Sequence, residues 1–156
     1  MMLVLKNLLF TFVLPGTVAA YVPWLIVRGG HPSTGVVLGV AVLVLSAGAC
    51  IYTWCVYDFA SFGRGTPAPI DAPKRLVVRG LYRHTRNPMY VGVLTVILGW
   101  ALLYLDTTVL TYALGVAAVF HLFIVSYEEP HLRSVFGAEY DAYRAHVGRW
   151  LPGRPQ

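Results

Sequence analysis

The sequence predicts an all-α, polytopic membrane protein with about four transmembrane helices and a C-terminal amphipathic helix. Of its 156 residues, 57% are hydrophobic and only 12% are charged, whereas soluble domains carry roughly 25% charged residues. A chain of this length leaves much of its surface exposed, so this apolar excess must face lipid. The apolar residues also gather into four runs, each close to the roughly 20 residues that a helix needs to cross a hydrocarbon core.

The four runs give the expected spans, which are residues 3–27, 35–59, 88–105 and 108–127. The second span opens with Gly35 and Gly39, whose spacing is typical of close helix packing but also occurs by chance. A short turn joins the last two spans into a hairpin. Thr107 or Thr108 in that turn can cap the last helix.

Charged residues lie in the gaps between the runs and predict the topology. The segment 60–87 carries six lysine and arginine residues and the tail after residue 128 carries four, whereas the other two connections hold only Arg28 and Asp106. Positive residues stay on the cytoplasmic side, so we expect the loop, the tail and the N-terminus in the cytoplasm. The arginine- and alanine-rich composition favours a bacterial inner membrane. The formal charge of +5 does not gather on one soluble face, which argues against a nucleic-acid partner.

We expect residues 1–156 to form one membrane domain. Its parts are two N-terminal spans (1–59), a cytoplasmic loop (60–87), a transmembrane hairpin (88–127) and an amphipathic tail (128–156). Apolar residues of the tail recur every three or four positions, as on one helix face: Leu132, Phe136, Tyr140, Tyr143, Val147 and Trp150. Glu129 and Arg133 lie one turn apart and can pair. The two cysteines lack metal-ligand spacing, so no metal site is predicted.

Residues 80–92, which read G-L-Y-R-H-T-R-N-P-M-Y-V-G, place polar groups at the start of the third span. Such groups are costly to desolvate and indicate a functional site, although a positive-inside anchor is an alternative interpretation. Pro88 suits the first turn of a helix, and Asn87 can cap that turn, where free backbone donors favour an anionic ligand. Gly92 lets a ligand or a neighbouring helix approach closely.

A second polar cluster, Glu128 and Glu129, follows the last span. Because the two helices of a hairpin have adjacent ends, these carboxylates are expected to face Tyr82 and Tyr90, whose rings offer flat faces for a ring or a cation. The two clusters together predict a polar pocket at the membrane surface. A purely structural ion pair, such as Arg86 with Glu128, is the alternative.

Four more residues are candidates for contacts with a substrate: Arg83, Asp58, His121 and Arg149. Asp58 ends the second span near the same surface, where it can bind a head group or simply mark the end of an interfacial helix. His121 lies seven residues before Glu128 and hence on the same helix face. A buried, hydrogen-bonded histidine is the alternative for His121.

Three motifs in order resemble those of the integral-membrane methyltransferases. They are the pattern over residues 80–92, the sequence E-E-P-H-L at 128–132, and F-G-A-E-Y-D-A-Y at 136–143. The resemblance covers roughly residues 60–152 and includes isoprenylcysteine carboxyl methyltransferases and phosphatidylethanolamine N-methyltransferases. The chain has Asn87 where the prenylcysteine enzymes usually have histidine, and this departure leaves the acceptor open.

The resemblance implies that S-adenosylmethionine binds at the cytoplasmic side, in a pocket walled by the last two spans and closed by the tail. It implies a cofactor pocket made of Tyr82, His84, Asn87, Pro88, Tyr90, Gly92, Glu128 and Glu129. Arg86, between cofactor and acceptor, is the expected catalytic residue, together with Glu129. The acceptor is expected to be a lipid-like or isoprenoid molecule, with the first two spans shaping its tunnel. No oligomeric state is predicted.

The chemistry of the acceptor is left open between a carboxylate and an amine. A carboxylate needs only Arg86 to position it. An amine arrives mostly protonated and needs a base, for which Glu129, Glu128 or a tyrosinate are the candidates.

Two other functions compete with methyl transfer. A membrane NADPH-dependent reductase of the sterol-reductase type has a similar C-terminal half, but it usually has a longer chain. A non-enzymatic tetraspan transporter or scaffold predicts ionisable groups near the middle of the membrane. His121 is the one candidate for such a group.

Overall fold

The computed structural model describes residues 13–63 and 75–151, and within these ranges the chain is helical without a β-strand. The α-helices are α2 (Val22–Val27), α3 (Gly35–Asp58), α4 (Pro88–Tyr104), α5 (Thr107–Phe123), α6 (Glu129–Phe136) and α7 (Ala138–His146). Three π-helical segments adjoin them, η1 (Thr17–Tyr21), η2 (Phe59–Gly63) and η4 (Ile124–Glu128), and η3 (Gly80–Arg83) is a 3₁₀ turn. The predicted all-α fold is confirmed.

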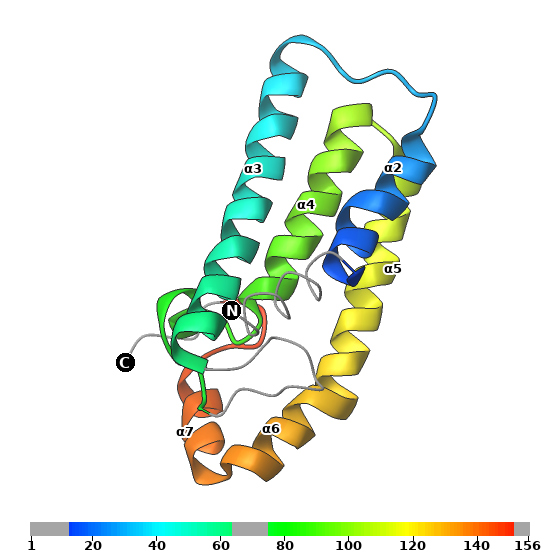
Figure 1. The fold of residues 1–156 in the computed structure, drawn as a ribbon. Coiled ribbons are helices and arrows are strands. Elements are labelled where there is room, and N and C mark those ends of the chain that lie inside the picture. Colours follow the sequence, from blue (N-terminus) through cyan, green and yellow to red (C-terminus); the bar gives the residue numbers. More distant parts are fainter. Residues whose placement is uncertain (1–12, 64–74, 152–156) are drawn as a thin grey trace.

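Long helices run side by side and the two tail helices lie at one end (Figure 1). Two continuous helices, Gly35–Phe62 and Thr107–Phe136, are long and apolar enough to cross a membrane, whereas Thr17–Val27 and Pro88–Tyr104 are apolar but shorter. Only 11% of the apolar stretch of the first long helix is buried inside the protein. An apolar helix that is exposed along its length is suited to lipid rather than water. The start of the expected first span lies outside the described residues, and the count of four spans stays a prediction.

Glycines bring α3 and α4 into close contact. A Cβ atom added at Gly48 would lie 2.7 Å from the backbone nitrogen of Val96 and 2.8 Å from the carbonyl oxygen of Gly92. Gly92 therefore serves the approach of a neighbouring helix, one of the two roles that the sequence left open. Gly39, by contrast, has nothing within 4 Å of an added Cβ. The small-residue spacing at the start of α3 thus makes no close helix contact among the described residues.

Asp106, and neither of the predicted threonines, caps α5. Its side chain accepts hydrogen bonds from the backbone nitrogens of Thr108 at 2.7 Å and Val109 at 3.0 Å. The N-cap residue is the one whose side chain can reach back to the free amides of the first turn. Since Thr107 and Thr108 already lie inside the helix, the prediction was wrong by one residue.

The last long helix does not end where the sequence predicted. It continues through η4 into α6, and the chain turns only at Gly137, which has φ +52°. The tail is therefore two short helices rather than one amphipathic helix. Its apolar stripe still forms a small core, which contains Tyr140, Tyr143 and Val147, with Leu132 and Phe136 packed against it. Arg133 pairs with Asp141 of α7 at 3.1 Å and not with Glu129.

Candidate functional site

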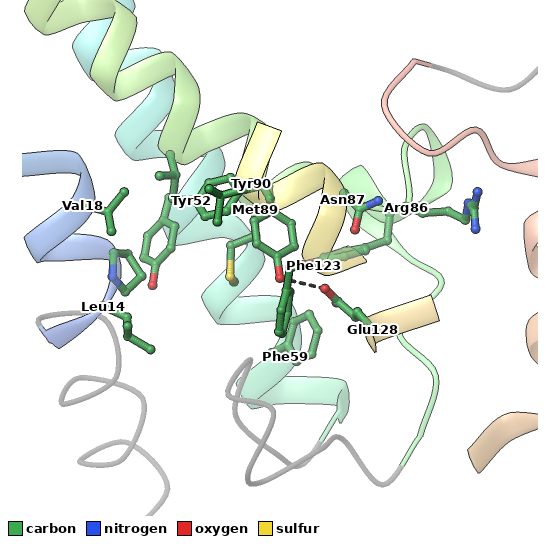
Figure 2. Close-up of a pocket in the computed structure, with 15 residues that line it drawn as sticks. Leu14, Val18, Tyr52, Phe59, Arg86, Asn87, Met89, Tyr90, Phe123 and Glu128 are labelled. Carbon is green, nitrogen blue, oxygen red and sulfur yellow. Dashed lines mark hydrogen bonds between the residues drawn. The ribbon is translucent and has the colours of Figure 1, made fainter. Parts of the chain in front are cut away.

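A cavity of about 360 Å³ lies where η1, the end of α3, α4 and α5 meet. Side chains such as Val18, Val119 and Phe123 line its apolar end, and Phe59 and Met89 also contribute. Its polar groups are Tyr52, Tyr82, Arg86, Asn87, Tyr90 and Glu128. In Figure 2, Leu14 and Val18 lie on one side of the cavity, and Arg86 lies on the other. The structure thus brings both predicted polar clusters to one cavity.

Each described π-helical segment contributes a side chain to this cavity. Val18 comes from η1, Phe59 from η2 and Glu128 from η4. A π-turn contains an extra residue, changes the register of the helix that follows, and is often found at functional sites. The turn at η4 explains why His121 does not line the cavity although it precedes Glu128 by seven residues.

Glu128 is bound by a tyrosine rather than by a cation. The hydroxyl of Tyr90 donates to Glu128 Oε2 at 2.7 Å (Figure 2). Within residues 13–63 and 75–151, no arginine, lysine or histidine lies within ion-pair distance of this carboxylate. The Arg86–Glu128 pair of the alternative interpretation is therefore not formed, and a half-buried carboxylate faces the cavity without a counter-charge from the described residues.

Arg86 pairs instead with Glu129, and both side chains are only 11% exposed. Its Nη1 lies 3.0 Å from Glu129 Oε1 and donates to the hydroxyl of Tyr140 at 3.2 Å. In Figure 2 the guanidinium group is directed away from Tyr90. The Nε atom of Arg86 is buried and has no hydrogen-bond partner in the part of the chain that the structure describes, so the residue retains one donor for a ligand.

Glu129 holds a second arginine from the tail. Arg149 donates to it through Nε at 2.7 Å and through Nη2 at 2.9 Å. This hydrogen bond raises the pKa of Arg149 above its ordinary value. Glu129 is therefore a structural anchor that joins the start of α4 to the tail, and Arg149 is engaged in that anchor. Glu129 also borders a more open groove beside Arg133 and Arg144.

The tail segment after α7 is tied to the residues that precede α4. The backbone nitrogen of Arg86 donates to the carbonyl oxygen of Gly148 at 2.9 Å, and Asn87 Nδ2 donates to the carbonyl oxygen of Arg149 at 3.1 Å. Asn87 occupies the N-cap position of α4, but its side chain makes no cap hydrogen bond. Its side chain holds the tail, contrary to the prediction.

Tyr82 and Tyr143 connect the same two segments. The hydroxyl of Tyr143 donates to the carbonyl oxygen of Tyr82 at 2.7 Å. Burial raises the pKa of Tyr82 well above its ordinary value, and burial also raises the pKa of Tyr143. Both phenols therefore stay protonated at neutral pH, which argues against either of them as a tyrosinate base.

Several predicted site residues lie outside the cavity. Arg83 and His84 are exposed and do not line it. Pro88 is buried at the first turn of α4, as expected from its fixed φ. His121 is exposed and accepts a hydrogen bond from Trp150 Nε1 at 3.2 Å. It is thus bonded as the alternative interpretation proposed, but it is not buried.

The sequence predicted no role for the phenylalanines that line the cavity. Phe120 packs its ring 4.7 Å from that of Tyr90, and Phe123 and Phe59 also line the space. The spacing of aromatic residues in the sequence does not distinguish the rings that line the cavity from those that face lipid. Tyr140 belongs to the tail motif at residues 136–143. The motif therefore marked Tyr140 as a candidate, but its contact with Arg86 was not predicted.

The sequence matches the family model described as phospholipid methyltransferase over residues 34–139, which is 106 of the 156 residues. The matched region runs from the residue before α3 into α7 and contains every polar residue that lines the cavity. No curated protein sequence matches the chain.

Proposed function

Because the chain belongs to the phospholipid methyltransferase family, we propose that it transfers a methyl group from S-adenosylmethionine to the amine of a lipid-like acceptor. The observation that carries the choice of an amine is Glu128, whose carboxylate faces the cavity and, among the described residues, is bound only by the hydroxyl of Tyr90. A half-buried carboxylate without a cation favours a positively charged guest. Family membership does not favour the reductase or the transporter.

The polar end of the cavity fits the groups of S-adenosylmethionine. The unpartnered Nε of Arg86 would donate to the carboxylate of the cofactor. The tilted ring pair of Tyr90 and Phe120, with Tyr82 nearby in the lining, offers an aromatic surface for the adenine. When bound, the cofactor supplies a methyl group on a positively charged sulfur. Glu129 would act indirectly, by holding Arg86.

The apolar end of the cavity would receive the chain of the acceptor. Leu14 is 54% exposed and Val119 is 63% exposed, although both line the cavity. The wall between η1 and α5 is therefore open to the surroundings of the protein, which for a membrane protein are lipid acyl chains. An isoprenoid chain would fit the same apolar wall.

Glu128 is the base that the geometry favours. An amine arrives as an ammonium ion, and Glu128 would accept its proton, which leaves the nitrogen lone pair free to take the methyl group. Tyr90 fixes the orientation of the carboxylate with its 2.7 Å hydrogen bond. Glu129 is unsuited to this step, since two guanidinium groups favour its charged form. A carboxylate acceptor would need a cationic donor, and the free donor of Arg86, its Nε atom, would already bind the carboxylate of the cofactor.

We place this site at the cytoplasmic face of a bacterial inner membrane, with the N-terminus, loop and tail on that side. The lysine and arginine residues of segments 60–87 and 128–156 support this orientation. The site lies at the end of the bundle where these two segments meet.

The test uses the purified full chain in lipid nanodiscs. Calorimetry should detect binding of S-adenosylmethionine, and methyl-labelled cofactor should label an amine-headed phospholipid rather than a carboxylate-ended isoprenoid. Glu128→Gln should lower the rate of transfer by on the order of 10²–10⁴-fold. Glu139→Gln, the same change at an exposed position of α7, is the control. Absence of cofactor binding, or label on the carboxylate alone, would refute the proposal.

A further inference from the structure

Asp58 is a buried carboxylate at the end of α3 that does not line the cavity. It is 1% exposed, and its Oδ1 lies 3.3 Å from Nε of Arg79. Its Oδ2 is buried and has no hydrogen-bond partner within residues 13–63 and 75–151. A buried charge is costly unless it is paired, so the pair with Arg79 fixes the start of the segment that leads to α4.

The next residue, Gly80, lies directly on this carboxylate. Its φ is +53°, a conformation that favours glycine. A Cβ atom added there would collide with Asp58 Oδ2 and would lie 3.0 Å from Trp54 Nε1. The turn η3 therefore rests on Asp58 on one side and is held by Arg79 at its beginning.

This contact is transmitted to the cavity through two aromatic residues. Phe59 follows Asp58, lines the cavity, and packs its ring edge-on against Tyr82 with centroids 5.5 Å apart. Tyr82 belongs to η3 and lies in one apolar cluster with the fully buried Cys55 and with Val77. A shift of the turn would therefore move Tyr82 and uncover Cys55.

We propose that Asp58 is a positioning residue for methyl transfer. Through its contacts with Arg79 and Gly80, Asp58 fixes the position of η3. The position of η3 determines where Tyr82 lies and where the chain continues to Arg86. Asp58 does so without touching the substrate, which replaces the expectation that it binds a head group. The inference rests on the proposed function, and a readout that is independent of activity accompanies it.

The first measurement is the rate at which a maleimide labels Cys55 in a Cys50→Ser background. Cys55 is fully buried, so labelling of the parent protein should be slow. Asp58→Asn keeps the shape but removes the charge, and should raise the labelling rate at least about tenfold if local opening becomes easier by 1.4 kcal/mol. Arg79→Lys should preserve slow labelling, because it keeps the charge. Arg75→Gln, at an exposed position near the same turn, is the matched control.

The second measurement is methyl transfer by the same variants. Displacement of reacting groups by about 1 Å can cost on the order of 10²-fold in rate, so Asp58→Asn should lower transfer by up to that factor. Arg79→Lys, which keeps the charge that pairs with Asp58, should retain most of the parent rate. If Asp58→Asn does not fold, Arg79→Gln breaks the same pair from its partly exposed side.

The outcomes separate this inference from the proposed function. Faster labelling together with slower transfer supports the positioning role. Labelling and transfer equal to those of Arg75→Gln overturn it, as does faster labelling with unchanged transfer. If the parent protein shows no transfer while labelling still rises in Asp58→Asn, the proposed function fails, and the control of the turn by Asp58 stands.

Discussion

Glu129→Gln should weaken the attachment of the tail to the site. The substitution keeps the shape of the side chain but removes the charge that binds two arginines. Glu129 lies 3.0 Å from Arg86 and accepts from Arg149 at 2.7 and 2.9 Å. After the change, both guanidinium groups face a neutral amide.

The magnitude follows from how deeply each partner is buried. Breaking a buried ion pair by removing one partner costs about 3–5 kcal/mol. Arg86 is 11% exposed and belongs to this regime, whereas Arg149 is 32% exposed and can be hydrated in the variant. The backbone contacts of Gly148 and Arg149 remain. We therefore expect a loss near the lower end, about 3 kcal/mol.

Two assays measure this effect on the purified protein in micelles. Chemical unfolding gives the change in the free energy of unfolding, and limited proteolysis reports detachment of the tail. Glu139→Gln makes the same change at an exposed position on α7 and should cost less than about 0.5 kcal/mol. The reasoning is refuted if both variants unfold alike and are cleaved at equal rates in the tail.

Two other predictions concern packing and pH. Gly48→Ala should lower stability by about 1–3 kcal/mol, because the new Cβ meets backbone atoms of α4 such as the carbonyl of Gly92. Gly39→Ala, with open space around the new Cβ, should leave stability unchanged. Equal unfolding of the two variants would contradict the close contact. The contribution of Tyr82 and Tyr143 to stability should be constant below about pH 9 and fall above about pH 10. Burial raises the pKa of both phenols in the folded state, so the unfolded chain loses these protons first. The slope is up to about 1.4 kcal/mol per pH unit for each tyrosine, and Tyr82→Phe should reduce it in pH-dependent unfolding measurements; an unchanged slope would contradict the assignment.

Features that depend on composition and local spacing were predictable from the sequence. The helical run at Gly35–Asp58 and the start of α4 at Pro88 agree with the structure. The convergence of the two polar clusters also followed, because the ends of a helical hairpin must be adjacent. The cap of α5 was displaced by one residue, to Asp106, since two threonines and an aspartate in one turn give equivalent signals.

Choices among partners were not predictable, because they depend on what the opposite element presents. The sequence does not show which of Gly39 and Gly48 contacts a neighbouring helix. In the structure Gly48, and not Gly39, lies against a glycine of α4. Likewise, the capping potential of Asn87 is intrinsic to asparagine. The tail provides a carbonyl acceptor for its side chain, and this competes with the cap.

The division of roles between Glu128 and Glu129 has a geometric cause. Successive residues of a helix point about 100° apart, because a turn holds 3.6 residues. Two adjacent carboxylates therefore cannot both face one cavity, so one of them meets Tyr90 while the other meets Arg86 and Arg149. The π-turn that ends at Glu128 decides which of them faces the cavity, because an added residue changes the register there. The pair of glutamates therefore supplies one carboxylate that faces the cavity, Glu128, and one that binds the arginines beside it, Glu129.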